Sequence, residues 1–355
     1  MTKTIKIGTR GSQLALWQAN WVKGEVERIL SRLNRIGSSN SGTDSNRDVL
    51  TSIPLIEIVK IKTTGDQITD RPLSMVGGKG LFVKEIEQQL LDKDIDIAVH
   101  SMKDMPAELP EGLRVGAIPV RANPFDVLIS KDNIPLNDLP AGAKIGTSSL
   151  RRASQIKNVR PDVVPVSIRG NLDTRLRKLE SGEYDAIVLA AAGLIRLGMK
   201  DRISEYLDED IMVPAVGQGA LCVESRLVDV QSDDHDLMIS NIMAALDDTN
   251  TRIPVEAERA FLRKMEGSCH IPVACFGKLE TIKKDAPHTA ENSGNLNGLN
   301  QLTLTGLVAS EDGSTIIKET LTCAAELSKA NEIGTELAEL ILQKGGREIL
   351  ESLKI

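Results

Sequence analysis

The 355-residue sequence has few cysteines, few aromatic residues and no long apolar run. Its four cysteines form no CxxC pair and have no histidine at the spacing of a zinc ligand, which argues against a disulfide framework and against a zinc site. No apolar stretch approaches the roughly 18 residues that cross a membrane. Aromatic residues make up 2% of the chain and the formal net charge is −7, so a nucleic-acid binder is disfavoured. We therefore expect an ordinary soluble protein with free thiols.

The N-terminal residues MTKTIKIGTR turn directly into an alternating strand pattern. They lack the apolar stretch and small-residue cleavage site of a signal peptide. Together with the scarcity of cysteine, this predicts a cytoplasmic protein.

The chain is too long for one hydrophobic core, so at least one domain boundary is expected. Strand and helix signals alternate up to about residue 198, with a proline-containing hinge at 119–124 between two similar halves. This order predicts parallel βαβ units, whose ligands meet the loops at the carboxyl ends of the strands. From about Thr251 the pattern changes to a helix, two strand regions and a long helix over 331–353. The predicted fold class is α/β, with two α/β lobes followed by a small α+β domain.

One segment is basic within this acidic chain. Between Lys144 and Arg202 there are twelve Lys and Arg against six Asp and Glu, a net of +6. Its arginines recur at or just past predicted strand ends, where helix N-termini add backbone donors. Because guanidinium groups suit carboxylates and phosphates, and because TSSLRR lacks a P-loop lysine, the set predicts a polycarboxylate site, although any single member could be a solvated helix arginine. The arginines are Arg151, Arg152, Arg169, Arg175 and Arg196.

Two further residues carry reactive groups in predicted turns. Asp104, in HSMKDMP, is either a turn residue or a carboxylate that stabilises a developing positive charge or relays protons to an amine. Cys269, in a Gly-Ser-Cys turn beside His270, is either an inert buried thiol or one whose thiolate is favoured by its neighbours. As a hydrolase nucleophile it lacks an identifiable base. The residues alone indicate a two-lobed, arginine-lined anion site with one thiol.

Eight motifs then resemble, in order, those of the porphobilinogen deaminase (hydroxymethylbilane synthase) family, and the resemblance covers nearly the whole chain. The most specific are VHSMKDMP and GTSSLRR. The others are GTRGSQLALWQAN, GGKGLFVKEIE, RGNLDTRLRKL, YDAIVLAAAGLIRLG, PAVGQGAL and GSCHIPVA.

The resemblance implies a transferase of tetrapyrrole (haem) biosynthesis. Members of the family join four porphobilinogens head to tail, release ammonia each time, and free hydroxymethylbilane with water. The implied cofactor is dipyrromethane, one per chain, held by a thioether to the cysteine that corresponds to Cys269. The resemblance further implies a monomer that acts on the small molecule porphobilinogen, with no metal, nucleic acid or membrane partner.

The family fold implies two lobes similar to type-2 periplasmic binding proteins and a third, α+β domain that carries the cofactor. On this sequence, the first domain is expected over 1–119 with about 215–240, the second over 120–214, and the third over 241–355.

The motifs also imply residue roles. Asp104 corresponds to the catalytic carboxylate, and Ser149 is expected to add hydrogen bonds. The residues expected to hold the cofactor are Cys269, Lys103, Ser101, Ser148, Arg151, Arg152, Arg169 and Gly170. Those expected to bind substrate are Arg10, Ser12, Phe82, Arg175, Arg196 and Gln218.

Two alternatives remain at this point. A non-catalytic solute-binding or effector-binding module would show a signal peptide or a helix-turn-helix, and a cysteine-dependent transferase or hydrolase would show a base paired with Cys269. The departures from the family pattern are insertions at 37–48 and 285–298, expected to be surface loops, and GSCH in place of the commoner GGCQ, which leaves the role of His270 open.

Overall fold

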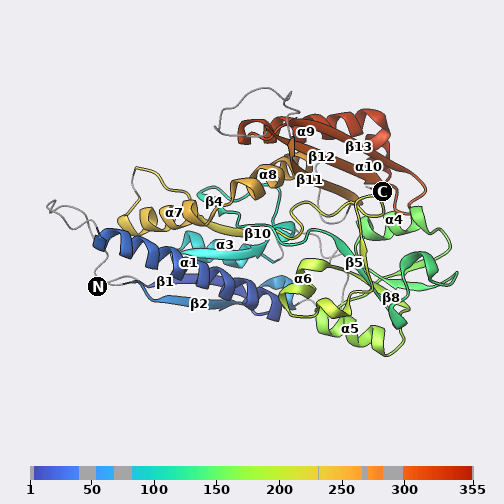
Figure 1. The fold of residues 1–355 in the computed structure, drawn as a ribbon, viewed down its shortest axis with the longest axis horizontal. Helices are drawn as coiled ribbons and strands as arrows, with labels where there is room; N and C mark the ends of the chain where they lie inside the picture. Colours follow the sequence, from blue (N-terminus) through green and yellow to red (C-terminus); the bar gives the residue numbers. More distant parts are fainter. Residues whose placement is uncertain are drawn as a thin grey trace, which may run out of the picture. The chain divides into compact units, whose positions relative to one another are not determined.

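Two five-stranded sheets and one three-stranded sheet form the described part of the chain (Figure 1). The computed structural model describes residues 4–39, 53–67, 82–230, 232–265, 271–282 and 299–353.

The chain divides into two compact units, each built from three separate segments. The first unit comprises Met1–Ala122, Gly193–Met199 and Gly219–Asp248. The second comprises Asn123–Ala192, Lys200–Gln218 and Thr249–Ile355.

The sheet of the first unit has the strand order β2-β1-β3-β10-β4. β1 is parallel to both of its neighbours, whereas β10 runs antiparallel between β3 and β4, so the sheet is mixed rather than wholly parallel. The late strand β10 therefore occupies the interior of a sheet begun at the N-terminus. The strands are β1 (Ile5–Arg10), β2 (Ile56–Ile61), β3 (Ile97–Ser101), β4 (Leu113–Ala117) and β10 (Leu221–Arg226).

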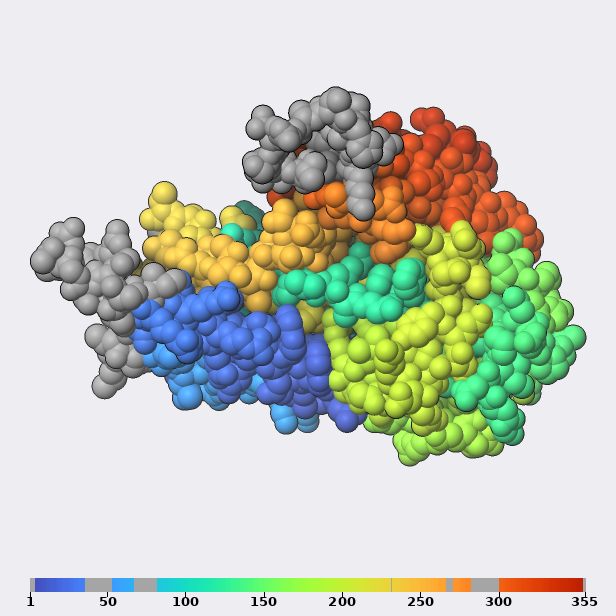
Figure 2. Space-filling view, viewed as in Figure 1, coloured from blue at the N-terminus to red at the C-terminus, as the bar shows by residue number. Residues whose placement is uncertain are grey.

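Helices cover both faces of this sheet because its strands alternate buried side chains to either side. α1 (Gln13–Ser39) and α7 (Asp234–Leu246) pack on the face that presents Ile7, Val99 and Val223. These two helices contact each other and lie side by side in the space-filling view (Figure 2). The opposite face presents Ala98 and is covered by α3 (Lys84–Leu91). Two short turns complete the unit, α2 (Thr64–Gln67) and the 3-10 turn η2 (Met102–Asp104).

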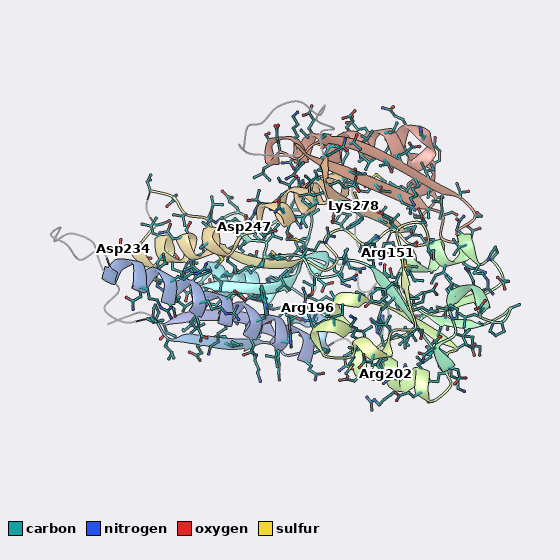
Figure 3. All side chains as sticks on the ribbon, viewed as in Figure 1. Arg151, Arg196, Arg202, Asp234, Asp247 and Lys278 are labelled. Carbon is teal, nitrogen blue, oxygen red and sulfur yellow. The ribbon has the colours of Figure 1, made fainter. Side chains whose placement is uncertain are left out.

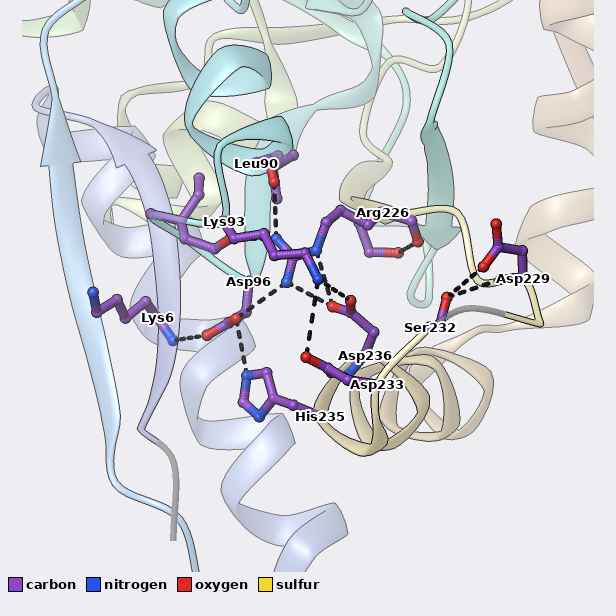
Figure 4. Close-up of polar contacts among 12 residues, drawn as sticks. Lys6, Leu90, Lys93, Asp96, Arg226, Asp229, Ser232, Asp233, His235 and Asp236 are labelled. Atoms are coloured by element: carbon purple, nitrogen blue, oxygen red, sulfur yellow. Dashed lines mark hydrogen bonds and ion pairs between the residues drawn. The ribbon is translucent and has the colours of Figure 1, made fainter. Parts of the chain in front are cut away.

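A network of charged side chains connects the segment Gly219–Asp248 to the N-terminal part of the first unit (Figure 4). The Arg226 guanidinium bonds Asp96 at 3.3 Å and Asp236 at 2.7 Å, and it donates to the carbonyls of Leu90 and Ile95. His235 lies 2.9 Å from Asp96. Because most of these groups are largely buried, losing one partner would leave the others uncompensated, which ties β10 and α7 firmly to the start of the chain.

The second unit contains a mixed sheet of order β7-β6-β8-β5-β9. β6 is parallel to β7 and β8, while β5 is antiparallel to β8 and β9. Asn171 begins one of the helices by accepting a hydrogen bond from the Thr174 N–H. The strands are β5 (Asp126–Ser130), β6 (Lys144–Gly146), β7 (Val164–Val166), β8 (Ala186–Ala190) and β9 (Glu205–Leu207). The helices and turns are η3 (Lys131–Asn133), η4 (Leu136–Asp138), α4 (Leu150–Val159), α5 (Leu172–Glu180) and η5 (Lys200–Arg202). The short helix α6 (Ala191–Arg196) begins in this unit, and its residues from Gly193 onward belong to the first unit.

The C-terminal part of the second unit is an antiparallel sheet packed against helices. Gly334 lets α8 and α9 approach closely, since a Cβ there would lie 2.2 Å from the carbonyl oxygen of Ala257. Phe261 is fully buried in the core between these helices and the sheet. The elements are α8 (Thr249–Lys264), β11 (Val273–Ile282), β12 (Leu299–Ala309), β13 (Ile316–Ala324), α9 (Leu327–Ile341), the π-turn η6 (Leu342–Gly346) and α10 (Arg347–Ser352).

These sheets confirm the predicted fold class, but some details differ. The single helix predicted over 331–353 is broken at 342–346, where Gly345 takes a φ of +108°. α1 continues to Ser39, into the first residues of the loop predicted over 37–48. The rest of that loop and the predicted loop 285–298 lie outside the described residues. The predicted domain boundaries stay predictions.

The described residues contain neither a candidate membrane span nor a candidate metal cluster. No helix there is long and apolar enough to cross a membrane. Nor do those residues bring together three or more His, Cys, Asp or Glu side chains that could hold a metal ion.

Candidate active site

Asp104 lies on a short turn directly after β3 in the first unit. Its side chain is exposed and forms no hydrogen bond or ion pair with the described residues. The turn itself is held by its backbone, because the Met102 N–H donates to the Ala220 carbonyl at 3.0 Å and the Met105 N–H donates to the Met102 carbonyl. Ser101, where β3 ends, accepts a hydrogen bond of 2.9 Å from Gln18. The backbone thus presents a carboxylate that has no partner among the described residues, with the half-buried Lys103 next to it in the sequence.

Arg10, at the end of β1, is brought together with Phe82 and Asp66. Its guanidinium carbon lies 4.1 Å from the centre of the Phe82 ring, and its side chain is paired with Asp66. Burial acts to raise the pKa of Asp66, but hydrogen bonds from Arg10 and Thr63 outweigh it and lower that pKa. The nearby Ser12 accepts a hydrogen bond of 3.2 Å from the Ala15 N–H, so it caps α1 as expected.

Arg196, at the end of α6, is a second arginine of the first unit that was predicted to bind substrate (Figure 3). Its guanidinium donates to the Gly219 carbonyl at 2.8 Å and lies 5.9 Å from the centre of the Trp17 ring. Burial lowers its pKa to about 10. Because no described carboxylate pairs with it, Arg196 is a desolvated cation suited to a bound anion.

Arg151 and Arg152, in the first turn of α4, share one carboxylate in the second unit. Arg151 Nη1 donates to Asp126 Oδ2 at 2.7 Å, and Arg152 Nε donates to Asp126 Oδ1 at 2.8 Å. Both arginines also bond backbone carbonyls, those of Val213 and Val188 respectively. All three charged side chains are buried. Because two guanidinium groups share one carboxylate, the cluster keeps one positive charge that Asp126 does not neutralise. Figure 3 shows where Arg151 lies on α4.

A second group of arginines surrounds the loop before α5. Gly170 has a φ of +113°, and a Cβ there would lie 2.5 Å from the Thr174 side chain, so a glycine is required. Arg175 Nε donates to the Gly170 carbonyl at 2.9 Å. Burial first, and then the charges of Arg152 and Arg169, lower the pKa of Arg175 to about 10. Guanidinium groups whose positive charges repel one another in this way favour the binding of an anion between them.

The remaining candidates of the second unit have structural partners. Ser148 donates to the Ile168 carbonyl at 2.6 Å and accepts from the Ile168 N–H, which joins two loops that carry arginines. Gln218 is fully buried and donates to the Pro124 carbonyl at 2.7 Å. Cys269 lies outside the described residues, as do the glycines of the turn at 77–80.

Sequence reasoning missed two buried carboxylates that organise this unit. Asp126 holds Arg151 and Arg152, and Glu258 accepts the Gly217 N–H at 2.6 Å and the Gly277 N–H at 2.9 Å. A charged residue that opens the apolar strand FDVLIS was a usable signal for Asp126. Glu258 gave none, because its helical pattern is that of an ordinary amphipathic helix.

The mixed α/β sheets, the desolvated arginines and the Asp104 carboxylate, which has no partner in the described part of the chain, are features expected of an enzyme that acts on carboxylate-bearing small molecules. Residues 5–234 match the family model described as "Porphobilinogen deaminase, dipyromethane cofactor binding domain", and residues 253–343 match "Porphobilinogen deaminase, C-terminal domain". The chain therefore belongs to the porphobilinogen deaminase family of transferases, also called hydroxymethylbilane synthases.

Full-length relatives agree. The porphobilinogen deaminase of Geotalea uraniireducens is 46% identical over 351 residues, covering 98% of this chain and 94% of its own length. That of Bacillus subtilis is 45% identical over 355 residues, covering 100% and 98%. These matches confirm the resemblance, the enzyme class and the dipyrromethane cofactor that the sequence predicted.

Among solved structures, a TRAP periplasmic solute binding protein from Desulfovibrio salexigens is similar at 10% identity and a TM-score of 0.39. The similarity covers 70% of this chain and 73% of that one.

Proposed function

We propose that this chain joins four porphobilinogens head to tail, releases one ammonia for each, and frees hydroxymethylbilane with water, using Asp104 as its catalytic carboxylate and Cys269 as the attachment point of dipyrromethane. The observation that carries this proposal is the group of like-charged arginines around Arg175. Burial and then the positive charges of Arg152 and Arg169 lower the pKa of Arg175. Each pyrrole of substrate and cofactor bears two carboxylates, so the growing chain needs several cationic partners.

The residues present fit a dipyrromethane group. Arg175 uses only Nε within the described residues, which leaves both of its Nη groups able to donate to a carboxylate. The Asp126 cluster adds its surplus positive charge, and Gly170 leaves its carbonyl and backbone close to the guanidinium. When bound, the cofactor supplies the pyrrole to which the first substrate is joined. We propose that the side chains that hold it are Lys103, Ser101, Ser148, Arg151, Arg152 and Arg169, with Gly170 as the close-approach position.

Asp104 is suited to the loss of ammonia. An exposed carboxylate that accepts no hydrogen bond within the described residues is available to the substrate. We propose that the Asp104 carboxyl group donates a proton to the nitrogen of the leaving amine. The carboxylate that remains then stabilises the positive charge that develops on the substrate pyrrole. The remaining substrate-binding roles are proposed for Arg10, Ser12, Phe82, Arg175, Arg196 and Gln218.

The family resemblance also supports a monomer that works in the cytoplasm on free porphobilinogen, without a metal, nucleic acid or membrane. We include these points in the proposal.

The test is the intact mass of the denatured protein, with peptide mapping. We expect an increment of two porphobilinogen units less two ammonia molecules, located on Cys269. Cys269→Ser should fold but lack the increment, whereas the control Cys323→Ser, at a partly exposed cysteine of β13, should keep it. If the native mass is unmodified, adding porphobilinogen should produce a ladder of pyrrole units. An increment that persists in Cys269→Ser, or no adduct under any condition, would overturn the proposed attachment.

The role of Arg175 is tested against a neighbour on the same helix. Arg175→Ala should raise the KM for porphobilinogen by about 10- to 100-fold, because a charge-assisted hydrogen bond contributes on the order of 1.5–3 kcal/mol. Steady-state rates of product formation measure this. Arg177 is exposed on α5, so Arg177→Ala should change KM by less than about twofold. Equal effects of the two substitutions would contradict a specific role for Arg175.

A further inference from the structure

Three ionisable side chains are buried where the first sheet packs on α3. Glu87 comes from α3, His100 from β3 and Glu224 from β10, and they are 5%, 6% and 0% exposed. Their surroundings on this face are otherwise apolar and include Ile86 and Leu90. We call these three residues the Glu87–His100–Glu224 network.

The network is only partly satisfied by hydrogen bonds. His100 Nε2 lies 3.1 Å from Glu224 Oε2. The Oε1 atoms of Glu87 and Glu224 are buried and have no hydrogen-bond partner in the described part of the chain. Burial first, and then the charge of Glu224, raise the pKa of Glu87 to about 7, while His100 and Lys84 oppose that rise. Near neutral pH a large share of the molecules therefore keep a proton on Glu87, which limits the negative charge around Glu224.

Burying such a network in an apolar layer costs desolvation free energy. Buried ionic groups contribute less to stability than well-packed apolar side chains of similar volume, so stability does not explain this one. Its place in the chain does suggest a reason. His100 immediately precedes Ser101, the last residue of β3, and the turn that carries Asp104 begins at the next residue.

The pairing of β3 with β10 runs up to the same point. His100 is paired with Cys222, Ser101 is paired with Leu221, and the Met102 N–H continues the ladder to the Ala220 carbonyl. The bond between His100 and Glu224 therefore links the side chains of the two strands where the backbone ladder ends. On the other face of the sheet Gln18 holds Ser101, so the strand end is fixed from both sides.

We propose that Glu224 and His100, with Glu87 behind them, are positioning residues that hold the end of β3 so that Asp104 meets the substrate in its reactive geometry. The proposal rests on the catalytic role proposed for Asp104. The three side chains are buried, so in this proposal the network acts through the backbone from His100 to Asp104.

The test separates kcat from KM. Glu224→Gln keeps the shape of the side chain and removes its charge, so it should lower kcat by about 10- to 100-fold, because small misplacements of a catalytic group have effects of this size. KM should stay within about threefold, since the groups that bind carboxylates are unchanged. The matched control Glu111→Gln, at an exposed glutamate before β4, should leave both constants unchanged. His100→Gln is a second variant with the same expected pattern, in case Glu224→Gln does not fold.

A double variant tests the route through Asp104. If Glu224 acts by positioning Asp104, then Asp104→Asn combined with Glu224→Gln should turn over no more slowly than Asp104→Asn alone. This inference would be overturned by a wild-type kcat in a folded Glu224→Gln protein that carries the dipyrromethane cofactor. It would also be overturned if the losses of kcat in the double variant were fully additive. Near-normal activity of Asp104→Asn would instead overturn the proposed function of Asp104, so the two failures are distinguishable.

Discussion

Asparagine at position 104 is expected to lower turnover by about 10²- to 10⁴-fold, the range for loss of a positioned proton-transfer or charge-stabilising group. The amide has nearly the shape of the carboxylate but can neither hold a proton for the departing amine nor offset a positive charge. Because Asp104 is exposed and has no described partner, its loss leaves no buried group unsatisfied. The free energy of unfolding should therefore stay within about 0.5 kcal/mol of the wild-type value.

The measurement is the rate of hydroxymethylbilane formation, with urea unfolding on the same preparations. Asp94→Asn is the matched control, because Asp94 is another exposed aspartate of the first unit, in the turn before β3. It should keep full activity. A folded Asp104→Asn protein that forms product at a near-normal rate would remove Asp104 from the mechanism.

Asp126→Asn is expected to have the largest effect on stability, about 3–5 kcal/mol of unfolding free energy. Asp126 is fully buried and is the carboxylate shared by Arg151 and Arg152. Without its charge, two guanidinium groups remain buried beside each other with only hydrogen bonds to offset their desolvation.

Urea or guanidinium unfolding of the second unit measures this loss. The control is Asp201→Asn, at an exposed aspartate of η5, which should change the unfolding free energy by less than about 0.5 kcal/mol. If Asp126→Asn stayed within about 1 kcal/mol of wild type, the buried cluster would not have the energetic role given to it here.

The sequence allowed the fold class, the order of most elements and the family to be predicted, because these depend on local periodicity and on motifs of adjacent residues. Gly345 and Gly346 also offered a local signal for the break between α9 and α10, which the prediction of one long helix passed over. The predicted roles of the site residues stay predictions.

The sequence did not reveal pairings across long separations. The sequence predicts anion-binding roles for Arg151 and Arg152 but gives no indication that both bind Asp126, from 25 and 26 residues away along the chain. The contact between His100 and Glu224 spans 124 residues. Periodicity describes which face of an element is buried, but it does not specify which side chain of another element is met there.

The interior position of β10 has a consequence for synthesis on the ribosome. The first 122 residues supply four strands of the first sheet, yet β4 cannot join the other three until β10 pairs with both β3 and β4, roughly 100 residues later. At about 5–20 residues per second, this interval lasts about 5–20 s. During it, both strand edges are unpaired and can bind other nascent chains. The sheet of the first unit therefore cannot be completed strictly in the order of translation, because it needs the strand that ends at Arg226.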